Sequence, residues 1–122
     1  MKTSLLTFLA LGLLAFAPAA LRAQTAPSTI VHVITVEWKD GTTPAQIQAA
    51  LDGVKALPGK YSGIVHVWTK AIKVQGAAKN AIVMEFSDAA AFKAYTDSPA
   101  QKEWYQTYLP IRKKSTTFAI TN

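Results

Sequence analysis

The sequence contains no cysteine and only two histidines among its 122 residues. Without cysteine, the chain has no disulfide framework, no thiol nucleophile and no Cys-anchored lipid. A zinc site needs three or four converging ligands, and neither His32 nor His66 has another ligand at metal-binding spacing. There is also no glycine-rich phosphate loop and no nucleophile elbow. We therefore expect no metal and no cofactor.

Acidic residues are scarce: 7 Asp and Glu stand against 13 Lys and Arg, which gives a formal net charge of +6. The basic residues are scattered, and only Arg112-Lys113-Lys114 forms a cluster. A nucleic-acid-binding protein concentrates its charge on one face or stripe, whereas three basic residues beside a strand are typical of an edge guarded against pairing. We therefore expect no nucleic-acid partner.

Long hydrophobic runs are missing except near the start, where an apolar stretch covers Leu5 to Ala17. Lys2 precedes this stretch, Pro18 breaks it, and small residues follow. This is the layout of a secretory signal peptide, and the run is shorter than the roughly 20 residues of a membrane-spanning helix.

We accordingly predict a signal peptide over residues 1–23, cut after Ala23 or after Ala19, and a linker over residues 24–28. The mature protein is expected to be secreted or periplasmic, with no stable membrane anchor. It would hold about 100 residues, which is enough for one small domain.

Alternation of β-branched residues and helix-start signals divide the rest of the chain. Two helix starts share one motif, Thr43-Pro-Ala-Gln46 and Ser98-Pro-Ala-Gln101, in which a hydroxyl cap is followed by Pro and then Gln. Another helix is capped at Ser87-Asp88 and runs through Tyr95. Strands are predicted over 29–38, 61–73, 80–86 and 114–121.

The order β-α-β-β-α-β, with the second helical region split, indicates a ferredoxin-like α+β fold, an antiparallel sheet with helices on one face. The other face is apolar and bare in a monomer. Such a patch is typical of an interface, so we expect a homodimer that forms an α+β barrel. The expected lining of this face is Val31, Val33, Val65, Val67, Ala81 and Val83.

Three segments together resemble the stress-responsive A/B barrel (Dabb) family: Ile30–Ile34, Glu85-Phe86-Ser87 and Tyr95–Trp104. The resemblance covers about residues 29–121, and it implies a dimeric barrel domain over 29–122. Some members of that family cyclise polyketide chains between the sheet and the helices with a Tyr–His pair. Related dimeric barrels include cofactor-free oxygenases and haem enzymes.

The chain departs from the catalytic pattern of that family. Ser98 and Gln101 stand where the catalytic type has two histidines, and Asn80 stands where some members have His or Asp. Gln cannot carry a proton as imidazole does. The resemblance therefore does not carry the Tyr–His chemistry over intact.

Most candidate site residues have a second interpretation. His32 is a base or hydrogen-bond donor, or a core histidine; Tyr95 is a ligand donor, or it packs beside Phe92. Ser98 and Gln101 contact ligand, or they form a capping box. Four aromatic residues line a ligand pocket or belong to the core or an interface: Trp68, Trp104, Tyr105 and Tyr108. Asn80 is expected to contact the ligand.

Three functions remain open. The leading one is an exported Dabb-like protein that binds a small apolar or aromatic ligand between sheet and helices. The second is a cofactor-independent cyclase, lyase or oxygenase on a phenolic or polyketide-like substrate, with Tyr95 polarising a carbonyl and His32 taking a proton. The third is a structural or interaction protein without a ligand.

Overall fold

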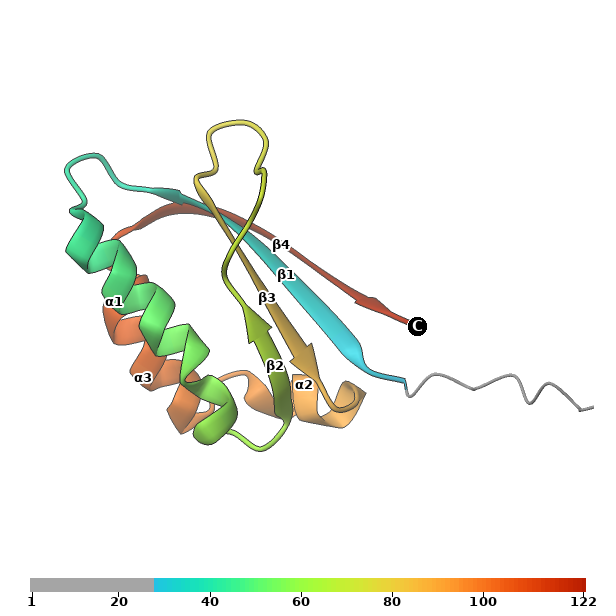
Figure 1. The fold of residues 1–122 in the computed structure, drawn as a ribbon. Coiled ribbons are helices and arrows are strands. Elements are labelled where there is room, and N and C mark those ends of the chain that lie inside the picture. Colours follow the sequence, from blue (N-terminus) through green and yellow to red (C-terminus); the bar gives the residue numbers. More distant parts are fainter. Residues whose placement is uncertain (1–27) are drawn as a thin grey trace, which may run out of the picture.

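The computed structural model describes residues 28–122, which form a four-stranded antiparallel sheet with helices on one face (Figure 1). The predicted ferredoxin-like α+β fold is therefore confirmed. The predicted signal peptide and nearly all of the linker lie outside the described residues. Within residues 28–122, no helix has the length and apolar character needed to cross a membrane.

The strands are β1 (Ile30–Trp38), β2 (Ile64–Trp68), β3 (Asn80–Phe86) and β4 (Arg112–Thr121), in the order β2-β3-β1-β4. The central strand β1 pairs antiparallel with both β3 and β4. β1 is therefore the inner strand between β3 and β4. Its residues are apolar on both faces, which is typical of a strand that is covered on both sides.

The helices are α1 (Pro44–Lys55), α2 (Ala89–Tyr95) and α3 (Pro99–Tyr108). α1 begins with the predicted capping box, since the Thr43 side chain accepts from the Gln46 amide and Gln46 reaches back to the Thr43 N–H. At α2, the Asp88 side chain accepts from the Ala91 N–H. α1 and α3 lie side by side, and α2 lies at the end of the sheet where β1 begins (Figure 1).

The core fills the space between the helices and the β2–β3–β1 part of the sheet. β4 is different, because its helix-facing residues Thr117 and Ala119 remain exposed. The helices thus leave the helix side of β4 uncovered at Thr117 and Ala119, and we call this part of the sheet the open flank. Buried side chains of the core include Val36, Trp38, Ile82, Met84, Phe86, Val54, Leu57, Trp104 and Tyr108.

β2 corrects the sequence prediction in length and in phase. It covers only Ile64–Trp68 rather than 61–73, and its register with β3 shifts between Ile64 and His66. An extra residue in one strand reverses the faces beyond it. Val67 therefore packs against the core, while His66 and Trp68 share the outer face with Glu85 and Val83, their register partners.

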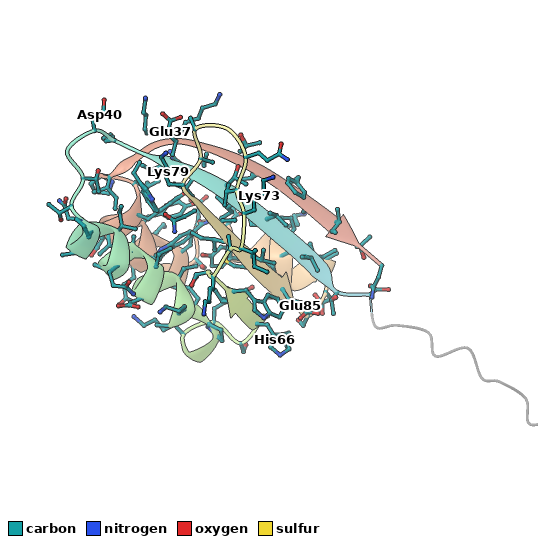
Figure 2. All side chains as sticks on the ribbon, turned by 45° about the horizontal axis from the view of Figure 1, so that its top comes forward. Glu37, Asp40, His66, Lys73, Lys79 and Glu85 are labelled. Carbon is teal, nitrogen blue, oxygen red and sulfur yellow. The ribbon has the colours of Figure 1, made fainter. Side chains whose placement is uncertain are left out.

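The outer face of the sheet has no covering element among residues 28–122. Val31, Val33, Ala81 and Val83 lie on it as predicted, and β4, which starts at Arg112 rather than Lys114, adds Phe118 and Ile120. Trp68, Phe118 and Ile120 are 50%, 52% and 57% exposed. Figure 2 shows charged residues at the two ends of the sheet, Glu37 at one and the Glu85–His66 pair at the other.

Gly63 is the point where β2 meets α2. A Cβ at Gly63 would lie 2.8 Å from the Ala91 Cβ and 2.5 Å from Tyr61 Cε1. Neither the helix backbone behind Ala91 nor the packed ring of Tyr61 moves easily, and overpacking of this kind costs about 1–3 kcal/mol.

We predict that Gly63→Ala lowers the free energy of unfolding by that amount in urea denaturation. Gly59→Ala is the matched control, because a Cβ there meets nothing within 4 Å, and its effect is expected within about 1 kcal/mol. Equal effects of the two substitutions would contradict the close approach of β2 to α2.

Candidate functional site

His32 lies on the helix-facing side of β1, opposite Met84 on β3 and Ala119 on β4. Its ring is half-buried, with a centroid 5.3 Å from that of Phe92 on α2. Burial lowers its pKa, so the imidazole is neutral at neutral pH. Nδ1 is buried and has no hydrogen-bond partner among the described residues, which leaves this nitrogen free for a ligand or a proton.

Tyr95 ends α2 and is 4% exposed. Its ring packs against Phe86 and Tyr61, with centroids 5.3 and 5.5 Å away. Its hydroxyl oxygen is buried, and nothing within residues 28–122 pairs with it. Burial, and secondly the nearby Tyr105 hydroxyl, raise the pKa of Tyr95. The group therefore stays protonated and is a neutral hydrogen-bond donor.

Gln101 organises the connection from α2 to α3. Its Oε1 accepts from the Asp97 N–H at 2.7 Å, and its Nε2 donates to the Tyr105 hydroxyl at 3.1 Å. Asp97 has a φ of 63°, in the left-handed region that non-glycine residues rarely adopt. Gln101 therefore supports a strained turn, and its donation to the Tyr105 oxygen leaves the Tyr105 proton available to another acceptor.

Tyr108 joins this group from the last turn of α3. It is 2% exposed, stacks on Trp104 with centroids 4.5 Å apart, and carries the Arg112 guanidinium 5.6 Å from its ring centre. Its hydroxyl is the third buried polar atom that lacks a partner in the described part of the chain. Burial raises its pKa, although Ser115 and Arg112 beside the hydroxyl oppose that effect.

These atoms lie at two places in the layer between β1 and the α2–α3 pair. His32 and Tyr95 pack around Phe86 and Phe92, and Tyr108 packs beside Trp38 at the other end of β1. Every buried side-chain nitrogen or oxygen without a partner in residues 28–122 lies there: His32 Nδ1, Tyr95 Oη and Tyr108 Oη. The layer borders the open flank, where Thr117 and Ala119 of β4 are exposed. Chemically, it offers neutral hydroxyl donors, a neutral imidazole and aromatic walls.

Asn80, predicted to lie near His32, and Trp104, predicted to line a pocket or belong to the core, lie elsewhere on the helix side. Asn80 accepts from the Trp38 indole N–H at 2.7 Å and pairs with Val36; this is four residues along β1 from His32, or about 13 Å. Trp104 is a core residue whose indole donates to the Ala50 carbonyl at 3.0 Å. Both polar groups already have structural partners.

Trp68 differs from the expected arrangement, whereas Ser98 takes the capping role that was one of its two predicted interpretations. Trp68 lies on the outer face of the sheet, stacked on His66 with centroids 5.3 Å apart, because of the bulge in β2. The Ser98 hydroxyl accepts from the Gln101 N–H at 3.2 Å, as an N-cap does. The box at α3 is incomplete, since the Gln101 side chain bonds Asp97 and Tyr105 instead.

The sequence analysis did not assign Arg112 to the site and treated it as part of a basic edge. The register pairs it with Trp38, on the helix side of the sheet. Ser115 and Thr117 follow on the same side. Alternation back from Ser115 would put Lys113 on this side, but a bulge opposite Glu37 and Trp38 brings Arg112 there instead, so no local signal in the sequence marks it. No group of three or more His, Asp or Glu that could hold a metal occurs in residues 28–122.

The fold and the bare outer face define a class, the ferredoxin-like α+β barrels. Within that class, residues 30–121 match the model of the stress responsive A/B barrel domain. The chain therefore belongs to the stress responsive A/B barrel (Dabb) family, as its sequence suggested. The comparison with curated proteins finds no match.

Solved structures share the fold at low sequence identity. The hydroxynitrile lyase of Passiflora edulis has a TM-score of 0.70 and 15% identity, over 79% of this chain and 94% of the lyase. A dimeric ferredoxin-like protein of unknown function from Thermobifida fusca has values of 0.66 and 17%, over 80% and 93%. A Dabb family protein from Mesorhizobium loti has 0.65 and 20%, over 78% and 97%.

A buried hydroxyl without a partner destabilises a fold, whereas a paired one contributes about 1 kcal/mol. We therefore predict that Tyr95→Phe leaves the free energy of unfolding unchanged or raises it by up to about 1 kcal/mol. Tyr61→Phe is the matched control, because the Tyr61 hydroxyl donates to the Ala91 carbonyl at 2.7 Å. It should lower stability by about 1 kcal/mol in urea denaturation. A loss as large for Tyr95→Phe would mean that its hydroxyl is paired in solution.

Proposed function

We propose that this chain is an exported homodimer that binds a small apolar or aromatic ligand between the sheet and the α2–α3 pair. The ligand carries an oxygen that accepts hydrogen bonds from tyrosine hydroxyls. Export rests on the signal-peptide layout of residues 1–23. The finer parts of this proposal, namely the ligand, the dimer and the export, each have their own support.

One observation carries the ligand-binding proposal. Two buried polar atoms without partners in residues 28–122, His32 Nδ1 and Tyr95 Oη, lie at one end of this layer around the Phe86–Phe92 pair. Nearly all buried polar groups in proteins are hydrogen-bonded, so each exception needs an explanation. A ligand oxygen at Tyr95 and a ligand acceptor or donor at His32 would satisfy these groups, and Phe92 beside His32 supplies an apolar wall.

The outer face supports a homodimer. Its centre is apolar and its ends carry the Glu37–Lys113 and Glu85–His66 pairs, at 2.7 Å each. An apolar centre with a charged rim is the usual composition of an interface. Structures of similar fold from Thermobifida fusca, Bacteroides fragilis and Jannaschia are described as dimeric.

We predict that the mature protein sediments as a dimer and that Phe118→Lys converts it to a monomer, because a buried unpaired charge is costly at the centre of an interface. Thr117→Lys is the matched control: it adds the same charge one residue away, on the opposite face of β4, and should stay dimeric. A monomeric parent protein in sedimentation velocity would contradict the proposed dimer.

For the ligand, we predict that native mass spectrometry of protein purified without refolding detects dimers that carry a small organic molecule. Tyr95→Phe should reduce the occupied fraction, because losing one neutral hydrogen bond weakens binding roughly three- to ten-fold. Tyr61→Phe should keep it. Empty dimers, with no ligand-dependent rise in melting temperature, would favour a structural or interaction protein.

A second candidate is a cofactor-independent enzyme on a phenolic or polyketide-like substrate. It is favoured by His32, whose neutral ring and unpartnered Nδ1 suit a general base. The Tyr95 hydroxyl would polarise a carbonyl as it does in the binding proposal. The His32→Ala variant distinguishes the two candidates. If the protein is an enzyme, the variant no longer converts the co-purified molecule. If it is a binding protein, parent and variant both leave the mass of that molecule unchanged.

A further inference from the structure

Arg112 is a half-buried cation whose charge no acidic group balances. The ion pairs within residues 28–122 use other cations, and the side chain that its guanidinium meets is the neutral Tyr108. The register places it opposite Trp38, on the helix side of the sheet, and its guanidinium lies over the Tyr108 ring. Burying a charge without a partner is unfavourable, so this position needs an explanation beyond guarding an edge.

Two tyrosines of α3 lie near this guanidinium: Tyr108 directly beneath it, and Tyr105 with its ring centroid 6.0 Å from that of Tyr108. The buried Tyr108 hydroxyl is within reach of Arg112 and Ser115, although no hydrogen bond of good geometry joins it to either. The positive charge also acts on Tyr105, whose pKa it lowers against the effect of burial. Tyr105 is only half-buried, and Gln101 leaves its proton free. One cation thus stands beside neutral hydroxyl donors.

This combination matches a planar monoanion. A guanidinium presents a rigid fork of N–H donors that fits both oxygens of a carboxylate. The fork also fits a phosphate, but a phosphate group carries roughly −1.5 to −2 charges at pH 7, and Arg112 is the one cation that β4 turns to this side, which favours the monoanion. Tyr105 adds a donor from the helix side, and the aromatic ring of Tyr108 holds the guanidinium in place.

The open flank continues from Arg112 toward His32. On β1, Trp38 and His32 are six residues apart, or about 20 Å along the strand. The exposed Thr117 and Ala119 of β4 lie beside that path, and Phe92 lies at its far end. We call this path along β1 and β4 the ligand strip. The Arg112 guanidinium lies at one end of it, and the end near Phe92 is mostly apolar.

We propose that Arg112 and Tyr105 bind the carboxylate of the ligand, with Tyr108 as a positioning residue, so that the ligand is a monocarboxylic acid with an apolar or aromatic body. This inference rests on the proposed ligand-binding function and specifies its ligand class. The body of the acid lies along β1 and β4 toward His32 and Phe92.

Calorimetric titration of the full mature dimer tests this assignment with cinnamic acid and decanoic acid, each compared with its methyl ester. The ester keeps the body and the carbonyl but lacks the charge. We expect the parent protein to bind at least one acid more tightly than its ester. Arg112→Gln should weaken that acid roughly ten- to hundred-fold, because charged hydrogen bonds are lost, and should leave the ester unchanged. Lys102→Gln is the matched control, since it removes the same charge from an exposed position on α3.

Arg112→Lys is the control for misfolding, because it keeps the positive charge and loses only the planar fork of N–H donors. This variant should bind the acid with intermediate affinity, and its melting temperature should be close to that of the parent protein. Equal binding of acid and ester, or full acid binding by Arg112→Gln, overturns the carboxylate assignment while leaving the ligand site intact. Failure of all four probes overturns the assignment as well. The co-purified molecule seen by mass spectrometry then decides separately whether a ligand site exists.

Discussion

The alternation of β1 is the constraint on which the rest of the structure depends. Each residue of a strand faces the side opposite to its neighbours, and β1 is paired on both edges, so a slip by one residue would exchange its two faces. His32, Val36 and Trp38 face the helices, while Val31 and Val33 face outward. The site and the proposed interface are therefore two sides of one central strand, and neither can be rearranged without the other.

The helices determine which part of this layer is open. α1 and α3 pack together over the sheet, with Trp104 bonded to the Ala50 carbonyl between them, and they leave the helix side of β4 exposed. Tyr95, Tyr105 and Tyr108 all come from α2 or α3. A tyrosine hydroxyl is already neutral at neutral pH, and burial raises the pKa of each of these three further. The same packing that stabilises the domain thus positions neutral hydroxyl donors in this layer.

Local patterns in the sequence predicted the fold well and the site only in part. Alternation located β1 and β3, and the Thr43 and Ser98 caps located the starts of α1 and α3, because these signals act within a few residues. The bulge in β2 has no such signal, and it moved Trp68 to the outer face. The hydrogen bond between Asn80 and Trp38 joins residues 42 positions apart, and the turn of Arg112 to the helix side depends on a bulge opposite Glu37 and Trp38, so local pattern could reveal neither. The structure puts His32 on the helix side of β1 and Tyr95 in the core, and their roles as ligand contacts stay predictions.

β4 connects the two proposed properties. Its odd and even residues serve different surfaces, since Phe118 and Ile120 face outward whereas Thr117 and Ala119 border the ligand strip. As an edge strand it is paired only with β1, and a strand held on one side gains order when a partner covers its exposed face. A second subunit on the outer face would bury Phe118 and Ile120 and fix the backbone between them. The position of Thr117 and Ala119, and with it the floor of the ligand strip, would then depend on dimerisation even though the two surfaces share no side chain.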